Sequence, residues 1–147
     1  SNPTEYEFNP EGIDLQVPIE MVDRGLSSGT AAITFSRSRT RIDTNDYVGE
    51  SAEYFFEIIA TNTNTATAGT VLLVDSTGTV LTDSSISVPA NTTALTRYRV
   101  QFTPNEGLAD YRVRLSGTST SGQLRVHVVR IIVQQRKAIK TRLYIPL

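Results

Sequence analysis

Arginine is the residue type in this sequence with the clearest capacity for chemistry. The chain has 12 arginines and 2 lysines. Five of the arginines alternate with apolar residues in three consecutive segments: Arg97, Arg99, Arg112, Arg114 and Arg125. If these segments are strands of one sheet, the guanidinium groups line one face that could bind carboxylates of an acidic polysaccharide or of a neighbouring subunit. Because like charges opposite one another destabilise a sheet, the alternative is that Glu53, Glu57 or the acidic N-terminal segment interleaves with them.

A second candidate site is the oxygen-rich loop from Asp43 to Glu50. Its possible calcium ligands are Asp43, Asn45, Asp46 and Glu50, since calcium takes carboxylate and amide oxygens. The loop departs from the helix–loop–helix calcium pattern, because Tyr47 stands where a ligand is needed. Surface turns are rich in Asp and Asn for local reasons, so an ordinary turn is the alternative.

Little else in the sequence favours catalysis or a cofactor. The chain has no cysteine and a single histidine, His127, which excludes a thiolate zinc site, a cysteine nucleophile and a cluster of histidine ligands. His127 follows Arg125 on an expected strand and has no nucleophile near it in the sequence. Asn91 begins an Asn-Thr-Thr triplet, a possible glycosylation site. We therefore expect no enzymatic activity and no cofactor, apart from the possible calcium.

Period-2 alternation of apolar residues recurs along the whole chain and predicts strands rather than helices. The expected strands are Ile13–Met21, Ala31–Phe35, Tyr54–Ala60, Val71–Asp75, Val80–Ser85, Tyr98–Phe102, Tyr111–Leu115, Leu124–Val133 and Ile139–Leu147. The phase slips near Val128–Val129, which predicts a β-bulge, and Ser76-Thr77-Gly78 predicts a hairpin turn. Eight or nine strands at this spacing predict one antiparallel, jelly-roll-like β-sandwich over residues 1–147.

Both ends of the chain alternate in the same way. The N-terminal arm, residues 1–22, contains Ile13, Leu15, Val17, Ile19 and Met21; the C-terminal arm, residues 137–147, contains Leu143, Ile145 and Leu147. Residues 1–23 have six acids and no base, whereas residues 97–147 have ten bases and two acids. Either the arms are strands of their own sandwich, or one is donated to a neighbouring copy, which makes a filament when the contact does not close.

The stretch from Tyr54 to Gln135 resembles the carbohydrate-binding-module and galactose-binding-like jelly rolls. The resemblance lies in the segments YFFEIIA, VLLVDSTGTVL, RYRVQFTP, DYRVRLSG and LRVHVVRIIVQ. It implies an extracellular, non-catalytic module. The chain departs from sugar-binding members in having no tryptophan, and its alternation places Tyr54, Tyr98 and Tyr111 in the core. Only Tyr6, Tyr47 and Tyr144 are then available to stack on a sugar ring.

Two functions remain as hypotheses. The first is an extracellular structural subunit of a filament or cell surface, which self-associates by terminal strand exchange and charge complementarity. The alternative is a module that binds a polysaccharide, whether acidic or neutral. The net charge of −1 argues against nucleic acid. No run approaches the roughly 18 apolar residues of a transmembrane helix, so we expect no membrane insertion.

Overall fold

The computed structural model describes residues 4–8, 13–20, 25–47, 51–137 and 141–145. Eleven strands and one short 3-10 helix follow one another along these residues. They are β1 (Thr4–Phe8), β2 (Ile13–Glu20), β3 (Leu26–Ser27), β4 (Ile33–Asp43), η1 (Thr44–Asp46), β5 (Ser51–Asn62), β6 (Gly69–Val74), β7 (Ile86–Val88), β8 (Thr92–Phe102), β9 (Leu108–Ser116), β10 (Leu124–Lys137) and β11 (Thr141–Ile145). No helix of the described residues has the length and apolar character needed to cross a membrane.

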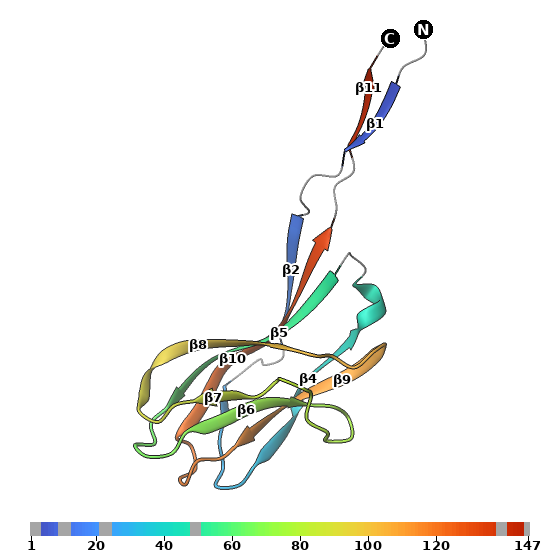
Figure 1. The fold of residues 1–147 in the computed structure, drawn as a ribbon. Coiled ribbons are helices and arrows are strands. Elements are labelled where there is room, and N and C mark those ends of the chain that lie inside the picture. Colours follow the sequence, from blue (N-terminus) through green and yellow to red (C-terminus); the bar gives the residue numbers. More distant parts are fainter. Residues whose placement is uncertain (1–3, 9–12, 21–24, 48–50, 138–140, 146–147) are drawn as a thin grey trace.

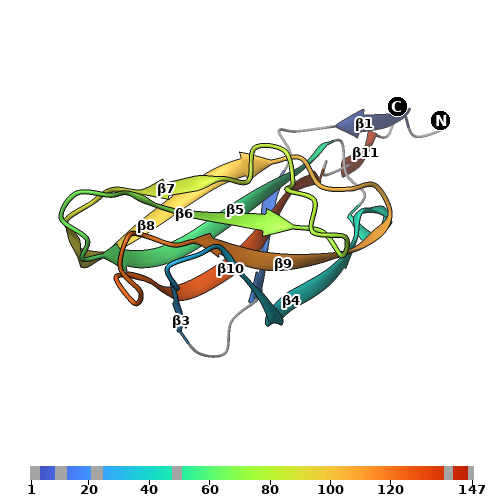
Figure 2. The same ribbon diagram turned by 90° about the horizontal axis from the view of Figure 1, so that it is seen from below.

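Eight of the strands form two antiparallel sheets packed face to face (Figures 1 and 2). The strand order is β2-β10-β5-β8 in one sheet, here the β10 sheet, and β4-β9-β6-β7 in the other, here the β9 sheet. The short strand β3 also pairs with β10. Apart from β6 and β7, successive strands of this set alternate between the sheets, which is the topology of a jelly roll. The fold class predicted from the sequence is therefore confirmed.

The core lies between the inner faces of the two sheets. Its side chains come from alternate positions of the long strands, such as Phe56 and Ile58 of β5 and Val113 and Leu115 of β9, all of them fully buried. The predicted core tyrosines lie there too: Tyr54 and Tyr111 are buried and Tyr98 packs against the cluster. Alternation of burial along each strand follows from the pleat, which sends successive side chains to opposite faces.

A line of aromatic rings closes one end of the core. The rings of Tyr47, Tyr54, Phe102 and Tyr111 meet edge to face in sequence, with centroids 6.2, 6.3 and 6.2 Å apart. The Tyr111 hydroxyl accepts a hydrogen bond from the backbone N–H of Asn105 at 3.1 Å. Burial raises the pKa of Tyr111. This tyrosine thus fixes the loop between β8 and β9 to the core.

The phase slip in β10 is a β-bulge, as predicted, but it lies slightly earlier in the chain. The register shifts between Val126 and Val128, which pair with the consecutive residues Ala60 and Ile59 of β5. His127 is the extra residue, and it is exposed. Buried inner positions therefore resume at Val129, which is why the apolar pattern alone placed the slip too late.

The turn at residues 75–79 lies where the sequence predicts it, but the strand expected after it does not form as predicted. Gly78 has the positive φ of 85° that the turn requires. The carboxylate of Asp75 accepts hydrogen bonds from the Thr77 hydroxyl and from the N–H groups of Thr77 and Thr79, and these bonds lower its pKa. Beyond the turn, Val80 forms only an isolated bridge, and β7 begins at Ile86.

A buried serine explains why the expected strand from Val80 to Ser85 is wrong. The Ser84 hydroxyl accepts a hydrogen bond from the N–H of Leu73 at 3.1 Å and donates one to its carbonyl at 3.3 Å. The Ser84 side chain thus makes the hydrogen bonds to Leu73 that the backbone of a neighbouring strand would make. The alternation of apolar residues gives no sign of this. The β4 prediction is also too short, since the strand continues from Ile33 to Asp43.

The polar loop after β5 is held by two buried asparagines. The Asn64 side-chain oxygen accepts hydrogen bonds from the N–H groups of Ala66 and Thr67, and its amide donates to Ser119 Oγ at 2.9 Å and Gln123 Oε1 at 2.7 Å. Asn62 donates to the backbone carbonyls of Thr67 and Val88. This Thr-rich loop is therefore ordered by side chains that substitute for a β-ladder.

We predict that Asn64→Ala lowers the free energy of unfolding by about 2–3 kcal/mol, because it removes the four hydrogen bonds that this buried amide makes to partly buried partners. Denaturant-induced unfolding measures the change. The matched control is Thr65→Ala in the same loop, whose exposed side chain predicts a change within about 0.5 kcal/mol. Equal effects of the two substitutions would contradict the prediction.

Candidate functional site

The N-terminal arm supplies an edge strand of the sandwich. Strand β2 pairs with β10 in a register that places Ile19 opposite Ile131, Val17 opposite Val133 and Leu15 opposite Gln135. Ile13 is opposite Lys137, whereas Met21 lies outside the described residues. Pro18, which lacks an N–H donor, is tolerated because β2 is at the edge of its sheet.

The two chain ends form a separate two-stranded ribbon. Strands β1 and β11 pair with each other, and within the described residues neither pairs with another strand. The ribbon lies beyond the end of the sandwich from which β2 and β10 emerge (Figure 1). Leu143 and Ile145 are in β11, opposite Tyr6 and Thr4; Leu147 lies outside the described residues.

The acidic and basic ends of the chain are neighbours in the structure. Asp14 is opposite Arg136 and Glu20 is opposite Arg130 in the β2–β10 register. Glu7 is opposite Arg142 in the β1–β11 register. Opposite charges at directly facing positions favour an antiparallel pair. Charge complementarity between the termini therefore favours pairing within one chain as much as between chains.

The five arginines predicted to share one face are divided between the two sheets. Arg97 and Arg99 of β8 and Arg125 of β10 belong to the β10 sheet. Arg112 and Arg114 belong to β9, which pairs with β4 and β6 in the opposite sheet. The prediction of a single cationic face is therefore wrong, because a jelly roll sends β8 and β9, which are consecutive in sequence, to different sheets.

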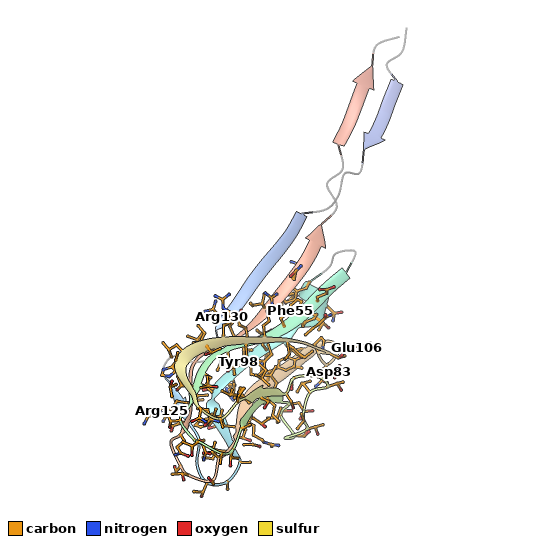
Figure 3. All side chains as sticks on the ribbon, turned by 60° about the vertical axis from the view of Figure 1, so that its left-hand side comes forward. Phe55, Asp83, Tyr98, Glu106, Arg125 and Arg130 are labelled. Carbon is orange, nitrogen blue, oxygen red and sulfur yellow. The ribbon has the colours of Figure 1, made fainter. Side chains whose placement is uncertain are left out.

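On the β10 sheet, the arginines interleave with Glu57 as the alternative interpretation predicts. Glu57 is only 4% exposed although it is on the outer face. Its carboxylate oxygens lie 3.6 Å from Arg97 Nε and 3.5 Å from Arg130 Nε. The guanidinium of Arg99 lies 4.0 Å from the centre of the Phe55 ring, a cation–π contact. Phe55 and Arg130 are labelled in Figure 3.

The β9 sheet has arginines on β4 that the sequence interpretation missed. Arg112 is directly opposite Arg39, and Arg41 is opposite Asp110. Arg41 Nε donates to Asp110 Oδ1 at 3.0 Å, which lowers the pKa of Asp110 and raises that of Arg41. Arginines at every second position of Ser36–Asp43 could have indicated this strand. They were missed because the prediction relied on alternating apolar residues, and few apolar residues accompany these arginines.

Arg114 has partners of its own on this sheet. Its Nε donates to the Thr34 hydroxyl at 2.9 Å, and Nη2 donates to the carbonyl of Gly78 at 3.3 Å. On the β10 sheet, Arg125 Nε donates to the carbonyl of Gly122 at 2.9 Å. Within the described residues, these bonds to a hydroxyl and to backbone carbonyls hold both side chains without a carboxylate partner.

The predicted calcium loop is a capped 3-10 turn in the part that is described. The Asp43 carboxylate accepts a hydrogen bond from the N–H of Asn45 at 2.9 Å, and Tyr47 packs against the core. Asn45 and Asp46 are exposed, while Glu50 lies outside the described residues. Among the described residues no group of three or more acidic or histidine side chains has the arrangement of a metal site; calcium stays a prediction of the sequence.

The possible glycosylation site is accessible. Asn91 is exposed, has a positive φ of 59°, and its side-chain amide donates to the carbonyl of Thr65 at 3.2 Å. Attachment of a glycan would replace one of the two hydrogens of the Asn91 side-chain amide. The structure therefore leaves the modification as a prediction.

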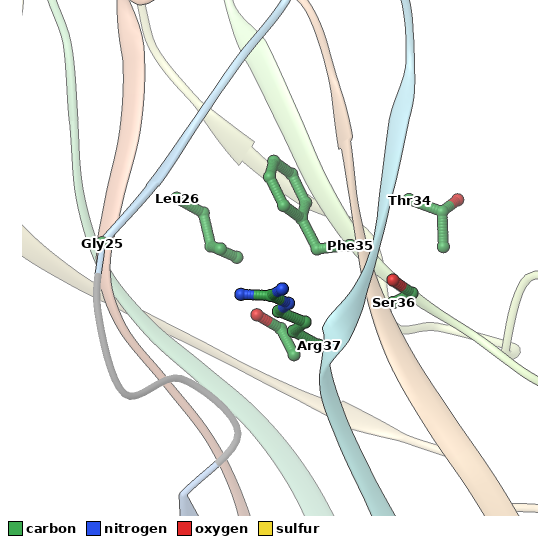
Figure 4. Close-up of a pocket in the computed structure, with 7 residues that line it drawn as sticks. Gly25, Leu26, Thr34, Phe35, Ser36 and Arg37 are labelled. Carbon is green, nitrogen blue, oxygen red and sulfur yellow. The ribbon is translucent and has the colours of Figure 1, made fainter.

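A pocket with a volume of about 360 Å³ lies between β3 and β4 (Figure 4). Its lining residues are Gly25, Leu26, Thr34, Phe35, Ser36, Arg37 and Ser38. It forms where three residues of β4 bulge out of the ladder, between Phe35 and Arg39. Arg37 is the only titratable group among these lining residues, so the pocket offers no acid–base pair for catalysis.

The fold and these surfaces define a jelly-roll sandwich with a terminal ribbon. The sequence matches no known family model and no curated protein. Among solved structures, the chain is similar to one of the infectious bursal disease virus Gx strain, with 15% identity, 91% coverage of this chain and a TM-score of 0.41. A second is the VP2 subviral particle of infectious bursal disease virus, with 14% identity, 99% coverage and a TM-score of 0.38. This chain spans 37% of the length of either of those chains.

We predict that Glu57→Gln lowers the free energy of unfolding by about 2 kcal/mol, because it removes the buried charge that Arg97 and Arg130 surround. Chemical denaturation at neutral pH measures the change. Glu53→Gln, the same substitution at an exposed position of the same strand, is expected to change stability by less than about 0.5 kcal/mol. A Glu57→Gln variant as stable as the Glu53→Gln variant would show that the ion pairs contribute nothing.

Proposed function

We propose that this chain is a non-catalytic structural subunit that self-associates through the ribbon formed by β1 and β11. The observation that carries the proposal is the isolation of that ribbon. Each of its strands has five residues, and within the described part of the chain they form a sheet of only two strands. Two-stranded sheets of this size are marginally stable in water by themselves.

The sequence of the ribbon favours a partner for it. Apolar residues occupy alternate positions of both strands, and the register places them together: Tyr6 opposite Leu143, with Phe8 and Ile145 at the flanking pairs. Alternation of this kind is typical of strand pairs with one apolar face. A second copy of the ribbon would supply the surface against which such a face is buried.

The backbone of the ribbon offers a second means of association. Each strand of a two-stranded sheet has one edge of unpaired N–H and C=O groups, which can pair with a strand of another chain. Strand addition of this kind derives affinity from main-chain hydrogen bonds and specificity from alternate side chains. The proposal thus keeps terminal strands as the means of assembly, and places the exchange at β1 and β11 rather than at β2.

No observation favours the alternative of a carbohydrate-binding module. Between residues 25 and 135, the aromatic side chains whose exposure the structure describes are all buried or half-buried, and Tyr47, one of the three expected platforms, packs against Tyr54. The side chains of Tyr6 and Tyr144 are not described. Sugar binding and an extracellular location remain predictions of the sequence.

The test is removal of residues 1–8 and 141–147, which deletes the ribbon and keeps every strand of the sandwich. Light scattering after size exclusion, over a concentration series, should show assemblies for the intact chain and monomers for the truncated chain. The unfolding temperature should change by only a few degrees, because the core between the sheets is intact.

A matched control tests whether exposed apolar surface in general, and not the ribbon, causes the assembly. Leu95 and Leu108 are 64% and 63% exposed, so a Leu95→Ser, Leu108→Ser variant removes apolar surface outside the ribbon and should still assemble. The proposal is wrong if the intact chain is monomeric at all concentrations, or if the truncated chain assembles as the intact one does.

A further inference from the structure

Arg39 and Arg112 face each other across β4 and β9 on the outer side of the β9 sheet. Directly opposite positions of an antiparallel pair have Cβ atoms about 4.5–5.5 Å apart, so two cations at such positions repel each other. A sheet normally places an acid or a neutral residue there. The pair therefore needs an explanation.

Asp110 is the anion among the strand neighbours of Arg112, and Arg41 already binds it. On its second side Arg112 is opposite Val74 of β6, which is fully buried and apolar. Two residues along β9 on the same face, Arg114 is a further cation. Asp110, two residues the other way, is bound by Arg41.

The hydrogen bonding of the pair is incomplete. The Nε of Arg112 is buried and has no hydrogen-bond partner in the described part of the chain. Within the same residues the Arg39 side chain has no hydrogen bond or ion pair, and it is exposed. Buried N–H groups without an acceptor are rare in folded proteins and costly.

The local charge is strongly unbalanced. Arg39, Arg41, Arg112 and Arg114 against Asp43 and Asp110 give a local charge of +2, although the chain as a whole has −1. Arg39 and Arg112 act on Asp110 through space and, after the hydrogen bond from Arg41, help to lower its pKa. Neither of these two guanidinium groups forms an ion pair within the described residues.

We infer that Arg39 and Arg112 form a binding site for a tetrahedral oxyanion of the phosphate or sulfate class. Guanidinium groups donate paired N–H bonds with the geometry that such oxyanions accept. One bound anion would offset the repulsion between the two arginines by accepting hydrogen bonds from their terminal N–H groups. Arg41 and Arg114 lie at the flanks and add attraction at longer range. The site does not depend on self-association through the ribbon.

The test is thermal unfolding in sodium phosphate and in sodium sulfate, each against sodium chloride of equal ionic strength. A ligand that binds only the folded chain raises the unfolding temperature in a saturable way. The intact chain should show this rise with both oxyanions. Arg39→Gln should weaken the apparent affinity for phosphate at least tenfold, and in chloride it should unfold at the same temperature as the intact chain or a higher one, because it relieves repulsion.

The matched control is Arg125→Gln, which removes an exposed arginine from the opposite sheet and should keep the full phosphate response. Arg112→Gln should lose the response as Arg39→Gln does; because Arg39 is exposed, the Arg39 variant decides the matter if the Arg112 variant fails to fold. The inference is overturned if phosphate and chloride act alike on the intact chain. Equal responses in the Arg39 and Arg125 variants would overturn it too, as would a clear loss of stability of Arg39→Gln in chloride.

Discussion

The pairing of β10 with β5 is the interaction on which the rest of the sandwich depends. The register runs from Leu124 opposite Asn62 to Arg136 opposite Ser51. Both strands lie inside their sheet, with β2 and β3 on the far side of β10 and β8 on the far side of β5. The inward-facing residues of β10 and β5 are almost all buried against the β9 sheet. The β9 sheet can pack in this way only because the two strands present one continuous apolar face.

That continuity depends on the bulge at His127. Without the extra residue, the inward-facing residues of β10 up to Val126 and those from Val129 onward would lie on opposite faces of the sheet. The reason is that a shift of one residue sends every following side chain to the other face. The bulge places the polar His127 outward and keeps valines and isoleucine inward on both sides of it. A single inserted residue thus lets one 14-residue strand contribute to the core along its length.

The two outer faces treat their arginines differently. On the β10 sheet, Glu57 is buried between Arg97 and Arg130, and Phe55 lies under Arg99, so these three arginines have an anion or a ring beside them. On the β9 sheet, Asp110 is bound by Arg41, and Arg39 and Arg112 are left facing each other. On the outer face of the β10 sheet, contacts within the chain largely offset the positive charge. The outer face of the β9 sheet has an excess of positive charge, which a bound anion would offset.

The sequence by itself determined the class of fold, because alternation is a local property that each strand carries in its own residues. It also determined the turn at Gly78, the bulge in β10 to within about two residues, and the burial of Tyr54 and Tyr111. It failed where a side chain replaced a backbone ladder, as Ser84 does, and where a strand had few apolar residues, as in the arginine-rich part of β4.

Only the tertiary structure decided which charged residues meet. Arg99 and Arg112 are close in sequence and lie on different sheets, whereas Arg39 and Arg112 are far apart in sequence and face each other. The assignment of strands to sheets and their register depends on how the apolar faces of distant segments pack together, and no single segment specifies that arrangement. The sequence therefore indicated which types of residue a site would contain, but not which individual residues come together to form it.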